Sequence, residues 1–389
     1  AQKATGARWT AEACFAYKGQ GYMWQNDYAN AKVELAKVIN SGKYELWEKT
    51  ATMGPSSYGT NMQLAKSQNE NWSDGNEEYE YLTLYRAEAD FCDEFLLELD
   101  IDGDATTITS TEPYWFRAYM NWRKDEVNLP GNTTTASDGW GFVNPTRTFG
   151  YAFAKHDGNS VRRRAAIATY SEVYHDFPYL NKDVRGVMSS MLFENEGYFR
   201  MKYYDFVDDV VPERFASGQT NGNRTNFPLM RYADVLLLYA EAVCMSGEGT
   251  ANITGLEALN KVRRRAGLTD APALDMDNAE YGIKAERRFE LWLEDCSRYV
   301  DLIRWGDYKK FITDTSIDGV SEHWGNECAW LVGLKDATVR TTDPTDWSNY
   351  EVRYDPLSTR GSWSDRFYLW PFPYAETTQN PNLVQNTGW

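Results

Sequence analysis

Apolar residues near the start of the chain recur every three or four positions, which is the spacing of one face of an α-helix. The first such stretch runs from Thr5 to Trp24, and Thr5 is the expected N-cap. The second follows Asp27, which can cap it, and the Ser41-Gly42 pair supplies a stop signal. We therefore predict a hairpin of two helices over residues 1–48.

More helical hairpins are predicted over residues 226–312. One apolar stripe ends at Ser246-Gly247 and the next ends before Gly267. The stripes consist of Met230, Ala233, Leu236, Leu237, Ala240 and Val243, and then of Leu256, Leu259, Val262 and Ala266. A third helical block is expected from about Ala279 to Cys296, continuing towards Phe311.

The lengths of these hairpins are close to that of the tetratricopeptide (TPR) repeat, about 34 residues. Hairpins at both ends of the chain can stack and bury one another's faces. We therefore predict a mainly α fold, with TPR-like helical hairpins as the scaffold and little β structure.

Helical periodicity fades between the hairpins and again after them. Residues 49–225 are rich in Gly, Asn, Thr, Pro and aromatic residues, and long loops on a scaffold usually carry function. We predict a loop-rich ligand-binding region there. Residues 313–389 are also loop-like, and we expect them to pack on the scaffold as part of one compact unit.

The charge balance of the chain limits its partners. The 389 residues include 57 acidic and 40 basic ones, giving a net charge of −17, and no run of four or more Lys or Arg occurs. This argues against nucleic acid or an anionic membrane surface. A neutral ligand fits better than an anionic one, although a local cluster such as Arg162 to Arg164 could reverse that.

Motifs for metals, nucleotides and nucleophilic catalysis are missing from the sequence. Three scattered histidines and five cysteines without a C-x-x-C spacing argue against zinc. Neither a phosphate-binding glycine motif nor a G-x-S-x-G elbow occurs. Asp100, Asp102 and Asp104 have the alternate spacing of calcium ligands, but Gly103 comes too early and no glutamate stands at the twelfth position. A solvated acidic turn is favoured, with a loop calcium site as the alternative.

Three glutamates stand four residues apart, at Glu286, Glu290 and Glu294, and would share one helix face. They could be catalytic carboxylates, as in a glycoside hydrolase. Alternatively, they form a structural network with nearby arginines, namely Arg287, Arg298, Arg304 and Arg263 to Arg265. The structural interpretation is favoured, because the arginines match the carboxylates in number.

Three co-linear motifs go beyond generic helices. They comprise residues 231–242 leading to 259–267, residues 286–306, and the ending made of 369–373 and 380–389. In these motifs the chain resembles the SusD/RagB family, and the resemblance covers essentially the whole chain. Family members are usually longer. They carry an N-terminal section with a lipobox cysteine and part of the ligand site, so a separate N-terminal section of the same precursor is a possible partner.

The resemblance implies a lipid-anchored protein of the outer membrane, exposed at the cell surface, with the anchor not present in this chain. It would bind an oligo- or polysaccharide without catalysis and deliver it to a SusC-like TonB-dependent transporter. Three alternatives stay open: peptide capture as in RagB, a secreted all-α glycoside hydrolase, and a TPR adaptor that grips a protein segment.

Aromatic rings in the middle region are the candidate ligand platforms, because a flat ring offers the C–H face of a sugar a large apolar surface. The resemblance also places ligand rings in this region. The candidates are Trp140 first, then Trp115, Tyr114 and Trp72, with Asn144 and Arg147 to bind hydroxyl groups. Trp292, Trp305 and Trp370 lie within the scaffold motifs and are predicted to be core residues.

Overall fold

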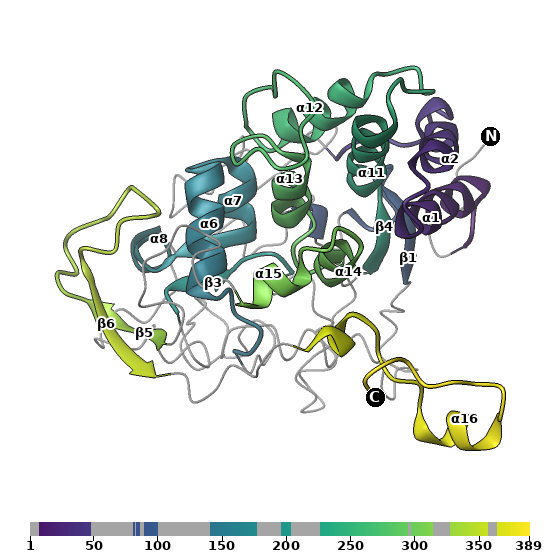
Figure 1. Ribbon diagram of the computed structural model, residues 1–389. Coiled ribbons are helices and arrows are strands. Elements are labelled where there is room, and N and C mark those ends of the chain that lie inside the picture. The colour runs from purple at the N-terminus through teal and green to yellow at the C-terminus, as the bar shows by residue number, and fades with distance from the viewer. Residues whose placement is uncertain are drawn as a thin grey trace, which may run out of the picture.

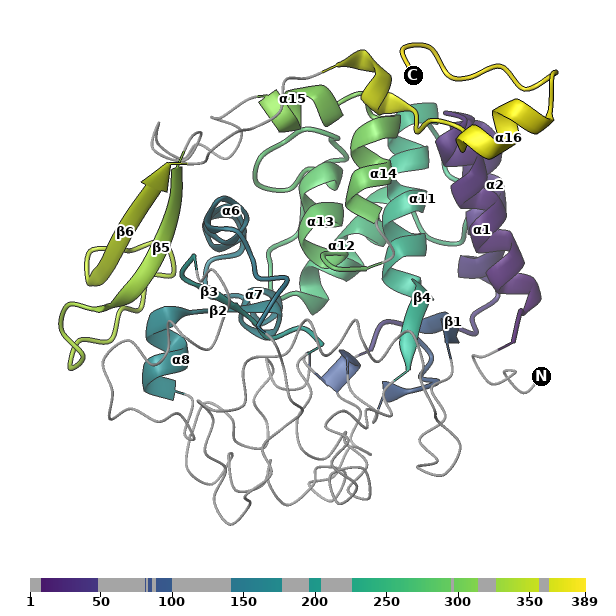
Figure 2. The same cartoon turned by 90° about the horizontal axis from the view of Figure 1, so that it is seen from below.

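Helices are the main regular elements of the structure (Figure 1). The computed structural model describes residues 8–47, 81, 83–85, 89–99, 141–176, 196–203, 226–294, 297–313, 327–356 and 364–389. In these parts the helices lie in a row that runs from the first hairpin, through a central group, to a second group beside a β-hairpin (Figure 2). The prediction of a mainly α fold is confirmed.

The first hairpin consists of α1 (Ala11–Trp24) and α2 (Tyr28–Asn40). Asp27 caps α2 as predicted, because its side chain accepts a hydrogen bond from the Asn30 amide at 3.2 Å. Small residues bring the two helices close together. Gly19 of α1 faces Leu35 of α2, and both are buried.

The predicted N-cap of the first helix is wrong. The helix begins at Ala11 rather than after Thr5, and Thr10 is its cap, with Oγ1 accepting from the Ala13 amide at 3.0 Å. Trp9, which the apolar pattern placed in the helix, precedes it and is 61% exposed. Thr10 carries the same capping hydroxyl as Thr5 but stands directly before the first helical residue.

The central helix is α11 (Tyr232–Ser246), in which every residue from Tyr232 to Ala242 is buried. It packs against α2, α12 (Gly255–Arg265) and α13 (Ile283–Glu290). Gly247 follows α11 with φ of 86°, a conformation that glycine adopts without strain. The predicted hairpin of α11 and α12 is confirmed.

The third helical block is broken where continuity was predicted. After α13 ends at Glu290 the chain turns, with Leu293 at φ of 64°. It resumes in α14 (Ser297–Arg304) and α15 (Tyr308–Thr313). Glu294 therefore lies in the turn rather than on the face of the helix, and from there its carboxylate contacts basic residues of two other segments.

Part of the region predicted to be loop-rich contains short helices. They are α6 (Arg147–Asp157), α7 (Val161–Ala166) and α8 (Tyr170–Asp176). Thr146 and Ser160 cap α6 and α7 through their hydroxyls. Such short helices, with aromatic and arginine side chains on their buried faces, leave a weak apolar period. The boundaries at 48, 225 and 312 stay predictions.

Three two-stranded antiparallel sheets are the only sheets in the parts just named. They pair β1 (Phe95–Leu99) with β4 (Phe227–Arg231), β2 (Ile167–Thr169) with β3 (Tyr198–Arg200), and β5 (Glu327–Leu334) with β6 (Tyr350–Pro356). In the first sheet Phe95 is opposite Arg231, and the Tyr232 amide donates to the Glu94 carbonyl at 2.8 Å. This register places Glu94 beside Arg231.

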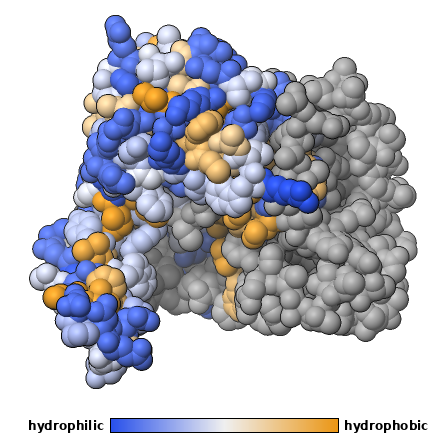
Figure 3. Space-filling model, turned by 90° about the vertical axis from the view of Figure 1, so that its right-hand side faces the viewer, coloured by the Kyte–Doolittle hydropathy of each residue, from blue (hydrophilic) through white to orange (hydrophobic). Residues whose placement is uncertain are grey.

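The C-terminal segment forms an arm with a 3-10 turn at Asp365–Tyr368 and α16 (Tyr374–Gln379). The arm projects from the body, and hydrophobic residues are scattered over it (Figures 1 and 3). Trp370 is 74% exposed, so the prediction that it is a core residue is wrong. Trp292 and Trp305 are half-buried. No described helix is long and apolar enough to cross a membrane.

The contact between α1 and α2 leads to a prediction about two glycines of one helix. A Cβ added at Gly19 would lie 2.7 Å from the Leu35 Cγ, whereas one added at Gly21 would meet nothing within 4 Å. We expect Gly19→Ala to lower the free energy of unfolding by about 1–3 kcal/mol through overpacking. Gly21→Ala should raise it by about 0.5–1 kcal/mol through helix propensity. Urea unfolding measures both, and equal effects would contradict the packing described.

Candidate ligand-binding site

A buried network of charges joins the helices at the centre of the molecule. Glu290, at the end of α13, is 1% exposed. Its carboxylate accepts from Arg265 at 2.5 Å and from Arg231 at 3.1 Å, and the Tyr81 hydroxyl donates to it at 2.8 Å. Arg162 lies 3.5 Å away. Four segments therefore meet at this one carboxylate.

The two neighbouring glutamates extend the network in both directions. Glu286 pairs with Arg162 at 2.8 Å and with Arg263. Glu294 pairs with Arg231 at 2.6 Å and with Lys202. The network continues to Glu94, which pairs with Arg265 at 2.7 Å and with Arg231.

Arginines keep the central carboxylate ionised. Burial alone would raise the pKa of Glu290, but the attraction of Arg265, Arg231 and Arg162 outweighs burial and lowers that pKa far below its ordinary value. A catalytic acid of a glycoside hydrolase needs a raised pKa instead. The predicted network with arginines is present, because Glu286, Glu290 and Glu294 each form buried ion pairs with arginine.

A second group of ion pairs lies between α11, α13 and α14. Arg287 pairs with Asp301 at 2.8 Å and with Asp234 at 2.6 Å. Glu241 accepts from the Trp305 indole at 2.8 Å and pairs with Arg304. These pairs all join residues of the motifs that carry the family resemblance, whereas Glu94, Arg162 and Lys202 of the first network lie outside those motifs.

The arginine run Arg162 to Arg164 is not an exposed basic patch, because its first two side chains are buried. Arg162 is 1% exposed and binds Asp157 at 2.9 Å as well as the glutamates of α13. Arg163 binds Glu172 at 2.6 Å. The expectation that this cluster could offset the negative surface charge is wrong for these two residues.

Most of the predicted ligand residues lie outside the described residues, namely Trp140, Trp115, Tyr114 and Trp72, as do Asp100, Asp102 and Asp104. The structure does place Asn144 and Arg147. Asn144 donates to the Gly141 carbonyl at 2.6 Å in the turn before α6. The Arg147 guanidinium is buried and lies 3.9 Å from the ring centroid of Trp347. Their role towards a glycan stays a prediction. No group of three metal-ligating side chains occurs in the described part of the chain.

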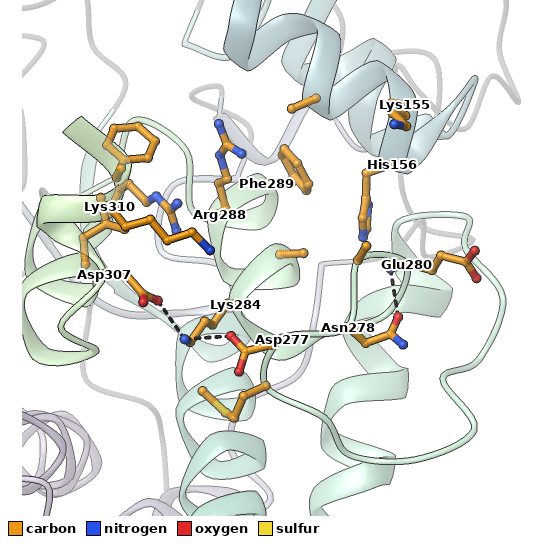
Figure 4. Close-up of a pocket in the computed structure, with 17 residues that line it drawn as sticks. Lys155, His156, Asp277, Asn278, Glu280, Lys284, Arg288, Phe289, Asp307 and Lys310 are labelled. Carbon is orange, nitrogen blue, oxygen red and sulfur yellow. Dashed lines mark hydrogen bonds and ion pairs between the residues drawn. The ribbon is translucent and has the colours of Figure 1, made fainter. Parts of the chain in front are cut away.

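A hollow of about 600 Å³ opens between α6, α13, α14, α15 and the loop at residues 276–280 (Figure 4). Its lining comprises charged side chains (Lys155, Asp277, Glu280, Lys284, Arg288, Arg298, Asp307 and Lys310) and apolar ones such as Met276, Phe289, Leu302 and Phe311. The sequence pattern missed it, because its side chains come from separate segments and share no motif.

Removing the central carboxylate should destabilise the fold strongly. We expect Glu290→Gln to lower the free energy of unfolding by about 3–5 kcal/mol, because buried arginines lose their counter-ion. Glu257→Gln is the matched control, since Glu257 pairs with Arg264 at 2.9 Å in an exposed bridge. That control should change stability by less than about 0.5 kcal/mol. Urea unfolding at neutral pH measures both, and a small loss for Glu290→Gln would refute a central role.

Acid should weaken the same network. Arg162 and His156 overcome the effect of burial and lower the pKa of Asp157 to about 2, below the ordinary value of about 3.9. The stability that Asp157 contributes, about 2–3 kcal/mol, is thus present above pH 4 and lost as pH falls towards 2. Urea unfolding at pH 5, 4 and 3 should show this decline. Asp157→Asn should flatten it, whereas Asp270→Asn, at an exposed site, should not.

Comparison with known proteins identifies the family. A sequence model of the SusD family matches residues 93–389. A SusD-like protein from Bacteroides ovatus is 27% identical over 164 residues, which are 41% of this chain and 28% of that protein.

Solved structures share the fold. The SusD-like protein from Bacteroides fragilis has a TM-score of 0.60 at 19% identity, covering 98% of this chain and 66% of that chain. Surface glycan-binding protein A from Bacteroides thetaiotaomicron, in complex with laminarihexaose, has a TM-score of 0.59 at 18% identity, covering 99% and 65%. Surface glycan-binding protein A from Bacteroides fluxus has a TM-score of 0.56 at 22% identity, covering 97% and 62%.

The chain therefore spans less than two thirds of the length of these relatives. The family model nevertheless covers well over half of this chain, and the matched residues include the ion pairs Arg231–Glu290, Arg287–Asp234 and Arg304–Glu241. The protein belongs to the SusD family.

Proposed function

We propose that the protein binds an oligo- or polysaccharide at the bacterial cell surface without catalysis. The observation that carries this proposal is the shared fold with a surface glycan-binding protein in complex with laminarihexaose, over 99% of this chain. A laminarin-binding SusD-like protein also shares the fold, with a TM-score of 0.51 at 21% identity over 81% of this chain and 58% of that protein. A β-glucan is accordingly the first ligand to test.

Stacking on aromatic rings and hydrogen bonds to hydroxyl groups would provide the affinity. Trp140 is the first candidate ring, followed by Trp115, Tyr114 and Trp72, and Asn144 and Arg147 flank this region at the start of α6. No covalent step is required. An open site that buries little of its ligand gives modest affinity.

The ligand would pass to a SusC-like TonB-dependent transporter in the outer membrane, with the binding protein held there by a lipid anchor. The net charge of −17 supports a neutral glycan as the main cargo.

Affinity electrophoresis in gels containing laminarin tests the proposal. Retardation is expected for the unmodified protein, and Trp140→Ala should weaken binding about tenfold because a stacking platform is lost. Trp24→Ala is the control, since Trp24 is an exposed tryptophan at the end of α1. It should leave retardation unchanged.

Other outcomes would favour the alternatives. Binding to oligopeptides with no retardation on any glycan would support a RagB-like peptide receptor. Release of reducing sugar from laminarin would support a glycoside hydrolase. Capture of a soluble protein rather than a membrane transporter would support a TPR adaptor.

A further inference from the structure

The hollow between α6, α13, α14 and α15 is basic on a strongly acidic protein. Five basic side chains and three acidic ones line it. In Figure 4, Lys310 and Arg288 reach into the hollow from one side, and Asn278 and Glu280 lie across from them. The local charge is thus opposite in sign to the net charge of −17. A basic hollow of this kind attracts an anionic ligand and raises its local concentration.

Two of the three acidic side chains are already engaged. Lys284 pairs with Asp277 at 2.8 Å and with Asp307 at 2.7 Å. The other basic side chains come from four helices and converge on the same space: Lys155, Arg288, Arg298 and Lys310. Neither Lys155 nor Lys310 forms an ion pair with any residue that the structure describes. These two exposed ammonium groups are available to a ligand.

The apolar part of the lining suits a ring. Phe311 is half-buried, and the guanidinium groups of Arg298 and Arg288 lie 5.3 Å and 6.0 Å from its centroid. A sugar ring can place its C–H face on such a surface while its acidic group meets the cations. Arginine suits this role because its planar fork matches a carboxylate.

The far side of the hollow offers hydrogen-bond acceptors. Asp277, Asn278 and Glu280 belong to one loop, which is held by the Asn278 side chain accepting from the Glu280 amide at 2.9 Å. Carboxylate and amide oxygens accept hydrogen bonds from sugar hydroxyls. A ligand that matches both sides of the hollow carries an acidic group at one end and hydroxyl groups at the other, as a uronic acid does.

We propose that this hollow is a binding subsite for a carboxylate-bearing sugar residue, a uronate. Its carboxylate would lie towards Arg288 and Lys310, and its hydroxyls towards the loop at residues 276–280. Lys155, which lies on the side of that loop in Figure 4, would add to the attraction for a chain of several uronates. The inference rests on the proposed saccharide-binding function and extends it, since the whole-chain charge alone favours neutral glycans.

Isothermal titration with trigalacturonate and with its methyl ester tests the subsite. The ester keeps the same rings and hydroxyls but lacks the charge. We expect the acid to bind at least tenfold more tightly than the ester, and its affinity to fall as salt rises. Equal affinity for both ligands would overturn the proposal.

Two adjacent lysines supply matched variants. Lys310→Gln should weaken trigalacturonate binding about threefold, and the double variant Lys155→Gln with Lys310→Gln about tenfold. Lys309→Gln makes the same charge change one residue away but outside the lining, and Lys309 lies 3.6 Å from exposed Asp365. It should change nothing. Equal losses for Lys309→Gln and Lys310→Gln would mean unspecific attraction and would refute the subsite.

Inorganic sulfate separates a sugar site from an anion site. Sulfate should compete only weakly with trigalacturonate, because it cannot use Phe311 or the acceptor loop. Competition at equal affinity would overturn the assignment to a sugar. Laminarin retardation is measured separately. If the protein is not retarded by laminarin but still binds trigalacturonate through the two lysines, the proposal of a neutral glycan ligand is refuted and the subsite is not. If laminarin retards the protein but trigalacturonate does not bind through the lysines, only the subsite is refuted.

Discussion

Glu290 is the residue on which the arrangement of the helices depends. A carboxylate removed from water is costly unless cations and hydrogen-bond donors replace the water. Here Arg231, Arg265 and Arg162 do so, and they come from β4, α12 and α7. Each arginine also binds a second carboxylate, so no segment can shift without leaving a buried charge unpaired. The packing of the helical row follows from this constraint as much as from its apolar stripes.

The helices with strong apolar periods were predictable from sequence, and so was the structural role of the glutamates. Asp27 begins α2 and Gly247 ends α11, as the apolar pattern predicted. The partners of the glutamates were only partly predictable. Arg263 and Arg265 are near in sequence, whereas Arg231 and Lys202 are 59 or more residues away from the glutamates they bind. Sequence spacing holds no information about such pairs.

Other errors have equally local causes. The turn at Leu293 needs a left-handed backbone conformation at a leucine. The sequence carries no signal for it, because glycine or asparagine is the usual residue in that conformation. Trp370 belongs to one of the three motifs that carry the family resemblance. In the structure, however, it lies in the C-terminal arm, where most of the hydrogen bonds join residues of the arm to one another. The Trp389 indole donates to the Leu369 carbonyl at 2.9 Å, and the Asn386 amide to the Trp370 carbonyl at 2.6 Å. The hollow could not be predicted from the sequence, because its charged side chains come from separate segments that meet only in the folded structure.

The reach of the ion-pair network along the chain has a kinetic consequence. Tyr81 and Glu290 are separated by 209 positions, and Glu94 and Arg265 by 171. Closing such long loops costs entropy before any favourable contact forms, and slow folding accompanies many non-local contacts. Partly folded states would bury arginines without their carboxylates and would be penalised for it. Because distant segments have to meet before the charges are paired, we expect the fold to form slowly.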